Sequence, residues 1–240
     1  MSLPRLRLEN CIKSDNLWHI DPEQAHHLVR VRRCYTGSLV EGLLDGVRVE
    51  LKLVCEGANV DAVEVSREAE PALSPEIHLL LAVLKNDQFD DAIRFSAETG
   101  VHTIHLLAAA RSVPKYEGKK LEEKMSRWRK ILDESTKQAG AATAPVLVSP
   151  VPVMSISTQS LPDTRYAAIL SSDAAALKSL PESEKLAVAI GPEGDWSPEE
   201  KEFLLKSGFS PISLGKRILR ASTAVAAACS WFALNISEKE

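Results

Sequence analysis

The 240-residue sequence lacks a long apolar run and has only four cysteines. No stretch approaches the roughly 18 apolar residues that a membrane-spanning helix needs, so we expect no membrane association. The opening MSLPRLRLEN also lacks the apolar core of a signal peptide. Scattered cysteines in such a chain are most simply reduced thiols. Together these absences predict a cytoplasmic protein.

The sequence also lacks the common metal and nucleotide motifs. Its cysteines, at positions 11, 34, 55 and 229, form no close pairs, and no Cys/His cluster is apparent, so no metal site is predicted. There is no GxGxxG after the first strand of the larger domain and no GxxxxGK[ST], which excludes the usual dinucleotide and P-loop sites. A GxSxG nucleophile turn is absent as well. Any ligand must be held by another geometry.

Charge is low overall but unevenly distributed. The formal net charge is −4. Residues 41–91 contain twelve Asp and Glu against four Lys and Arg, whereas residues 111–130 contain eight Lys and Arg against three Glu. Smaller basic clusters are RVRR at 30–33 and GKRILR at 215–220. An acidic protein with basic patches can bind phosphates, although such patches also occur as solvated helix faces.

The first 70 residues have the pattern of a small β domain. Short alternating runs such as RLRLE and VRVELKLV are separated by turn residues, including Asp45-Gly46. They predict an antiparallel sheet closed into a barrel. One helix is expected over 22–31, with Asp21 as its N-cap. The proline-containing segment EAEPALSPE, residues 68–76, predicts a linker, so we expect domains at 1–70 and 76–240.

From residue 77 onward, apolar strands alternate with amphipathic helices. The helices are expected at 86–100, 119–140 and 222–235, and the strands at 77–84, 101–108, 145–149, 166–172, 186–190 and 211–214. Residues 150–163 have the Pro/Ser-rich composition of a connection. This alternation predicts an α/β fold in which helices cover both faces of a parallel sheet.

One loop, IGPEGDW at 190–196, follows a continuous apolar strand and precedes a helix start. Ser197 suits the N-cap, Pro198 the first helical turn, and Glu200 a capping box. Gly191 and Gly194 can adopt positive φ and leave space for a ligand. Ligands bind at the carboxyl ends of strands in open α/β sheets, but a tight strand-to-helix turn explains the same residues.

The combination of IGPEG with the later GF…ISLGKRILRASTA resembles the RsmE family of ribosomal RNA methyltransferases, in the SPOUT class. The resemblance spans nearly the whole chain. It implies an RNA-binding PUA-like β-barrel at 1–70 and a methyltransferase domain with a trefoil knot at 76–240. It also implies methylation of N3 of a uridine in small-subunit (16S) ribosomal RNA or the small ribosomal subunit. S-adenosylmethionine (SAM) would be the methyl donor, no metal would be needed, and the protein would be a homodimer through the knot region.

The resemblance also assigns residues to the SAM site. These are Leu170, Ser171, Ile190, Gly191, Pro192, Glu193, Gly194, Leu214, Gly215, Ile218, Leu219 and Arg220. Arg220 is the catalytic candidate, because a fixed cation would stabilise the negative charge that develops on the uracil oxygens. The alternatives are that Arg220 binds a phosphate or holds the knot loops. Glu193 is either the base or a structural residue.

RNA contacts are implied at two places. The stretch HHLVRVRR resembles the family's basic segment and assigns phosphate contacts to Arg30, Arg32 and Arg33. Arg111 corresponds to a segment that faces the active-site cleft. Solvated surface arginines are the alternative for all four. The apolar C-terminal helix fits either a dimer interface or ordinary core, through the side chains Val225, Cys229, Trp231 and Phe232.

Several positions depart from the family pattern where we expect contact with the substrate. They are Phe95 for Lys, Lys137 for Glu, Ala141 for Arg, Ala221 for Thr and Ser222 for Glu. The donor-binding motifs are kept, so SAM binding is better supported than the identity of the accepting base. Two alternatives therefore stay open: a SPOUT RNA methyltransferase with another target base or RNA, and a non-catalytic RNA-binding relative.

Overall fold

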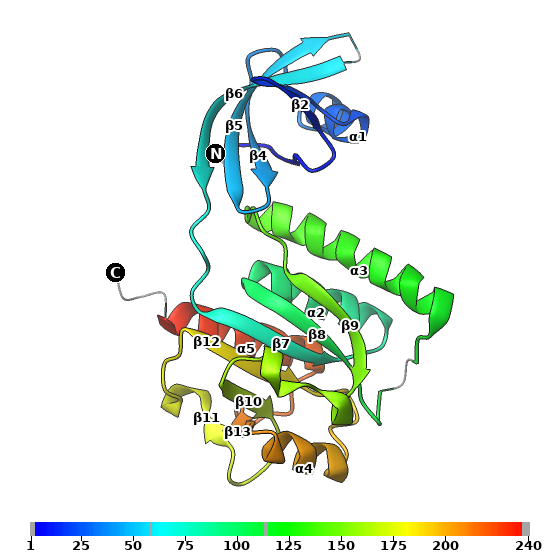
Figure 1. Cartoon of the computed structure of the whole chain (residues 1–240), viewed down its shortest axis with the longest axis vertical. Helices are drawn as coiled ribbons and strands as arrows, with labels where there is room; N and C mark the ends of the chain where they lie inside the picture. The colour runs from blue at the N-terminus through cyan, green and yellow to red at the C-terminus, as the bar shows by residue number, and fades with distance from the viewer. Residues whose placement is uncertain (1–2, 58, 113–114, 237–240) are drawn as a thin grey trace. The chain divides into compact units, whose positions relative to one another are not determined.

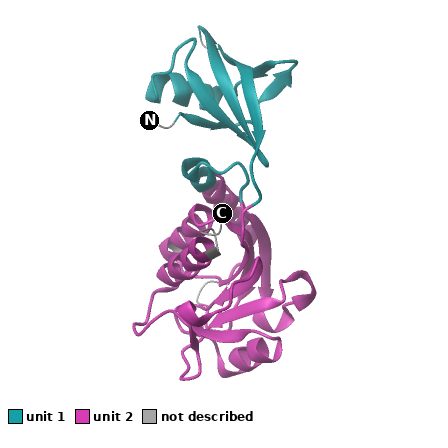
Figure 2. Ribbon diagram, turned by 90° about the vertical axis from the view of Figure 1, so that its left-hand side faces the viewer, with its two compact units in different colours: residues 1–72, 134–144 teal, residues 73–133, 145–240 magenta. Residues whose placement is uncertain are grey.

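A computed structural model describes residues 3–57, 59–112 and 115–236. The chain divides into two compact units (Figure 2). Unit 1 comprises Met1–Ala72 and Glu134–Ala144, and unit 2 comprises Leu73–Asp133 and Pro145–Glu240. Residues 134–144 thus join the N-terminal unit although they lie far along the chain. None of the helices in the described ranges combines the length and the hydropathy of a membrane span.

Unit 1 is built on a six-stranded sheet with the order β1-β4-β5-β6-β3-β2. Its strands are β1 (Arg5–Arg7), β2 (Ile12–Ser14), β3 (Leu17–His19), β4 (Leu39–Leu44), β5 (Val47–Glu56) and β6 (Asn59–Ala69). A bulge in the β5–β6 ladder, between Glu50 and Leu51, favours bending of the two longest strands. The curled sheet is a half-barrel, since no pairing between described residues joins β1 to β2.

The expectation of a purely antiparallel sheet was wrong at one edge. β1 pairs with β4 in parallel, with Arg5 opposite Glu41, while the other pairs of this sheet are antiparallel. Between β1 and β4 the chain runs through β2, β3 and the helical segment. Such a long crossover connection allows the chain to return in the same direction, which a short hairpin does not.

The predicted helix of unit 1 is confirmed, in two parts. α1 (Pro22–His26) continues into one π-helical turn, η1 (His27–Val31). Asp21 caps it, because Asp21 Oδ1 accepts hydrogen bonds from the backbone N–H groups of Glu23 and Gln24 at 3.1 and 3.2 Å. Leu28 anchors the helical segment in the core of unit 1.

Unit 2 contains a seven-stranded sheet with the order β11-β13-β10-β12-β7-β8-β9, in which every pair is parallel (Figure 1). Its strands are β7 (Glu76–Ala82), β8 (Val101–Ala108), β9 (Val146–Pro152), β10 (Thr164–Ala168), β11 (Ala175–Ala176), β12 (Lys185–Ile190) and β13 (Ser210–Ser213). The helices are α2 (Asn86–Glu98), α3 (Gly118–Ala139), α4 (Pro198–Lys206) and α5 (Ala221–Ile236), with short 3-10 turns η2 (Val153–Ser155), η3 (Thr158–Ser160) and η4 (Leu177–Ser179). The predicted parallel α/β sheet is confirmed, although β10 ends at Ala168 and β9 runs on to Pro152.

Helices cover both faces of the sheet, as predicted. α2, α3 and α5 pack on one face, where the rings of Phe89 and Trp128 lie 4.5 Å apart. α4 packs on the other face, where Trp196 and Leu204 are fully buried. Alternate residues of each central strand therefore enter two separate cores, which explains why these strands are apolar without interruption.

Strand order reveals how the chain crosses itself. β13 lies between β10 and β11, so the connection 169–174 has to pass across β13. After β13 the chain continues through residues 214–220 into α5, which packs against α2. This strand order is compatible with the trefoil knot that the SPOUT resemblance implies. In α5, Val225, Cys229 and Phe232 are buried in the core of unit 2, so these three residues are core rather than an exposed interface.

Candidate functional site

A cavity of about 800 Å³ opens at the carboxyl ends of β10, β12 and β13. Its walls are the three loops that follow these strands. All twelve residues that the resemblance assigned to SAM line it: Leu170, Ser171, Ile190, Gly191, Pro192, Glu193, Gly194, Leu214, Gly215, Ile218, Leu219 and Arg220. Nine further residues that the sequence did not predict also line the cavity: Gln88, Ala168, Ile169, Asp195, Ile212, Ser213, Arg217, Ala221 and Ala224. The volume is in the usual range for a small-molecule site.

The glycines of the 190–196 loop have a packing reason. A Cβ on Gly191 would lie 3.0 Å from Trp196 Cε2, and one on Gly194 would lie 3.1 Å from the Cβ of Arg111. Trp196 is fully buried, and its indole N–H donates to the Ala168 carbonyl at 3.2 Å. Neither glycine uses the positive φ that glycine permits. In this loop the left-handed residue is Asp195, with φ of 61°.

The predicted capping box fixes the far end of the loop. Ser197 Oγ accepts from the Glu200 N–H at 3.2 Å, and Glu200 Oε2 accepts from the Ser197 N–H at 2.8 Å. The second carboxylate oxygen of Glu200 accepts from the Ala110 N–H at 2.7 Å. Glu200 is buried. It therefore joins the start of α4 to the loop after β8, and this holds the cavity wall in place.

Two predicted site residues also brace this loop. Glu193 Oε1 accepts a hydrogen bond from the backbone N–H of Lys85, the residue before α2, at 3.2 Å. Arg111 Nη1 donates to the Gly194 carbonyl at 3.0 Å. The loop after β12 is thus tied to the segments that follow the neighbouring strand β7 and the next strand of the sheet, β8. Both side chains are themselves exposed.

The segment before α5 contributes two arginines to the lining of the cavity. Arg217 and Arg220 both line the cavity and are exposed. Neither makes an ion pair within the described part of the chain. Arg220 immediately precedes α5, and its carbonyl accepts from the Ala224 N–H at 2.8 Å. Its backbone is anchored by the helix while its guanidinium is available to a ligand.

The cavity also presents apolar surface and an unused polar atom. Ile218 is 83% exposed and Leu170 is 64% exposed, which is unusual for large apolar side chains. Gln88 Oε1 is buried and has no hydrogen-bond partner among the described residues. Buried polar atoms are nearly always paired, so we expect a bound ligand to donate a hydrogen bond to this oxygen. No motif marks Gln88; its one signal is a polar residue in the first turn of a helix that follows a buried strand.

The departures from the family pattern lie in different places. Ala221 lines the cavity, and Ser222 beside it is buried. Phe95 packs against the core of unit 2. Lys137 and Ala141 belong to unit 1. Only one of the five therefore forms part of the cavity wall, and that one removes a hydroxyl from it.

The basic residues predicted in unit 1 are on its surface. Arg30, Arg32 and Arg33 are all exposed and follow one another along and just after η1. The described residues offer none of them an ion-pair partner. Tyr35 is exposed as well. Arginines beside an exposed aromatic ring form a surface suited to phosphates and unstacked bases.

Comparison with known proteins gives consistent matches. Residues 71–233 match the model of the RNA methyltransferase domain family. A ribosomal RNA small subunit methyltransferase E 2 of Borreliella burgdorferi is 29% identical over 93% of both chains. A Legionella pneumophila protein solved with bound SAM has a TM-score of 0.86 at 26% identity and covers 97% of both chains. The ribosomal RNA small subunit methyltransferase E of Neisseria gonorrhoeae, also solved with SAM, has a TM-score of 0.83 at 24% identity over 95% of both chains, which supports the fold.

Proposed function

Because the chain belongs to the RNA methyltransferase family, in its RsmE branch, we propose that it methylates N3 of a uridine in small-subunit (16S) ribosomal RNA with SAM as donor. The observation that carries this proposal is the convergence of all twelve assigned residues on one cavity. They come from three loops separated by up to 50 positions, so sequence proximity does not explain their meeting.

The lining residues fit SAM chemically. The exposed apolar side chains of Ile218 and Leu170 offer surface for an adenine ring. The backbone of 191–194 is accessible because two of its residues lack side chains, and Gln88 Oε1 offers an acceptor for a ligand N–H group. SAM supplies a methyl group on a sulfonium, which is electrophilic without a metal. The protein has to place uridine N3 in line with that methyl group.

Arg220 is assigned the electrostatic role. N3 of uridine carries a proton at neutral pH, and negative charge spreads onto the uracil oxygens as that proton leaves. An exposed guanidinium that makes no ion pair with any described residue, on a backbone fixed by α5, is suited to stabilising this charge. The hydrogen bond from Lys85 N–H to Glu193 supports a positioning role for Glu193 rather than that of the base.

The RNA partner would bind through both units. Arg30, Arg32 and Arg33 would contact phosphates, and Arg111 would contact the RNA near the cavity. A homodimer through the knot region belongs to the same proposal because the family resemblance implies it. A cytoplasmic location belongs to it because ribosomal RNA would be the substrate.

The test is methyl transfer with product identification. Small subunits from a strain that lacks this methylation would be incubated with the protein and labelled SAM, then digested to nucleosides and analysed by mass spectrometry. We expect 3-methyluridine. At saturating SAM, Arg220→Ala should lower the rate at least ~100-fold, as loss of a transition-state donor does. Lys216→Ala, a neighbouring cation outside the cavity lining, is the matched control.

Other outcomes would replace the proposal. A different methylated nucleoside would indicate a SPOUT enzyme with another target. SAM binding without any methylated product would indicate an RNA-binding relative without turnover. An Arg220→Ala variant that transfers methyl groups at the wild-type rate would remove the electrostatic role from Arg220.

A further inference from the structure

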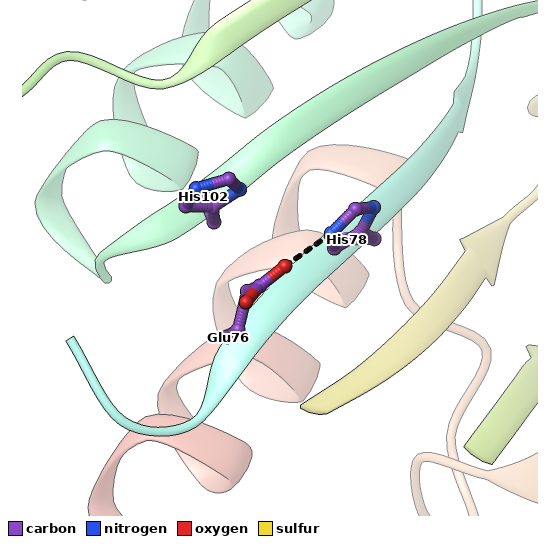
Figure 3. A group of neighbouring side chains, drawn as sticks. All are labelled: Glu76, His78 and His102. Atoms are coloured by element: carbon purple, nitrogen blue, oxygen red, sulfur yellow. Dashed lines mark hydrogen bonds and ion pairs between the residues drawn. The ribbon is translucent and has the colours of Figure 1, made fainter. Parts of the chain in front are cut away.

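Three side chains with metal-ligating atoms meet at the opposite end of the sheet from the cavity. Glu76, His78 and His102 lie at the amino ends of β7 and β8 (Figure 3). One potential ligand atom from each lies within 4.8 Å of the others. His78 is buried, Glu76 is half-buried and His102 is exposed. The group is therefore held by the sheet on one side and accessible on the other.

The sheet register brings these residues together. Glu76 and His78 are two positions apart on β7, so they project from the same face. On β8 the register shifts: Ile77 lies opposite Val101, but His78 lies opposite Thr103. His102 is the extra residue of this bulge, and a bulge re-aims its side chain. The His102 ring is thereby stacked on that of His78, with centroids 5.6 Å apart.

Each side chain is also held by a second contact. Inside the group, His78 Nε2 lies 3.0 Å from Glu76 Oε1, a contact that a shared ion would replace. Outside the group, His78 Nδ1 lies 3.1 Å from His105 Nε2. Lys185 Nζ holds the other oxygen of Glu76 at 2.6 Å. His102 Nδ1 lies 2.9 Å from Thr103 Oγ1. Outer contacts of this kind orient the ligands in metal sites.

We propose that Glu76, His78 and His102 form a binding site for a divalent transition metal of the zinc class. Two imidazoles and a carboxylate are a known three-residue zinc set, with the fourth position left to water. Imidazole nitrogens favour Zn²⁺, Co²⁺ or Ni²⁺ over Mg²⁺ and Ca²⁺. Ligand atoms around tetrahedral zinc lie about 3.3 Å apart, so ligand atoms that lie within 4.8 Å of one another have to approach by about 1.5 Å or less.

This site is separate from methyl transfer. β7 runs from Glu76 at this end to Ala82 near the cavity, which at about 3.3 Å per residue is about 20 Å. A metal here would join the amino ends of two adjacent strands of unit 2. We therefore expect it to raise thermal stability and to leave the chemistry of the cavity unchanged.

The experiment is a metal titration of the untagged, full-length protein. After dialysis against a chelator and then chelator-free buffer near neutral pH, Zn²⁺ binding is measured by calorimetry and Co²⁺ binding by its visible absorption. We expect one ion per chain, a higher melting temperature with Zn²⁺, and no competition by Mg²⁺. His102→Ala should weaken Zn²⁺ binding at least ~10-fold, and, because His102 is exposed, the variant should fold normally.

His26→Ala is the matched control, because His26 is an exposed histidine outside the cluster. It should bind Zn²⁺ as the wild type does. Equal affinity of wild type and His102→Ala would overturn the proposal, as would the absence of Zn²⁺ binding by the wild type. Either result would leave the cluster as a hydrogen-bonded network that stabilises the bulge.

Discussion

Ile218 offers a sharp test of the cavity, because its side chain is large, apolar and 83% exposed at the cavity wall. Truncation to Ala removes three carbon groups, each worth about 0.8 kcal/mol when buried. If SAM covers the exposed part of the side chain, the variant loses about 2 kcal/mol of binding free energy. At 1.4 kcal/mol per factor of ten, this is a roughly 30-fold increase in Kd.

The assay is calorimetric titration with SAM and with S-adenosylhomocysteine, beside thermal melting of the free protein. Because Ile218 is exposed, Ile218→Ala should change the unfolding free energy by less than about 0.5 kcal/mol. Ile12→Ala is the matched control: Ile12 is 70% exposed, but it lies on β2 of unit 1, outside the cavity. Its Kd should equal that of the wild type.

An Ile218→Ala Kd within twofold of the wild-type value would refute the contact with SAM. Sedimentation analysis of the same variant would then test whether Ile218 lies in an interface between two copies of the chain. If the variant loses self-association while keeping its SAM affinity, the exposed side chain is covered by a second copy of the chain and not by the ligand.

Three further predictions concern individual side chains. Glu200→Ala should lower the unfolding free energy by about 2–3 kcal/mol in denaturant titration, because it removes half of the capping box and leaves the Ala110 N–H without its acceptor. Cys229 should resist thiol reagents at pH 8 until the protein unfolds, because burial raises its pKa to about 12. Hydrogen bonding, first to Arg67, lowers the pKa of Glu64 to about 2. The stability that ionised Glu64 contributes is then present above about pH 4.5 and is lost as the pH falls towards 2. Over that window the melting temperature of Glu64→Gln should therefore fall less steeply than that of the wild type.

Much of the cavity could be predicted because its signals are local. The strand 186–190, the glycines after it and the capping box at Ser197 are contiguous, and each follows from backbone conformation or hydrogen bonding that neighbours decide. Strand ends in a parallel sheet then meet at one edge, which brings the loop together with the basic segment before α5. Gln88 could not be predicted in this way. Its oxygen belongs to the site only because α2 begins beside the loop after β12, where Glu193 accepts from the Lys85 N–H.

Features that depend on tertiary structure had no local signal in the sequence. The parallel pairing of β1 with β4 follows from the path of the intervening chain, and the addition of residues 134–144 to unit 1 follows from where α3 ends. For Gly191, the sequence did not show that the missing side chain also makes room for Trp196. In each case the deciding neighbour is supplied by tertiary structure.

The cluster of Glu76, His78 and His102 also depends on a neighbour that only tertiary structure supplies. Glu76 and His78 are close in sequence, but His102 lies 24 positions beyond His78. Extending the register that pairs His78 with Thr103 would put His102 opposite Ile77, on the other face of the sheet. One extra residue in β8 reverses that direction. Linear spacing therefore predicted no metal site, whereas register places two imidazoles and a carboxylate together. Deleting the bulge residue His102, rather than replacing it with Ala, should then abolish Zn²⁺ binding and shift the β7–β8 ladder into regular register, which hydrogen exchange of Val101 and Thr103 would report.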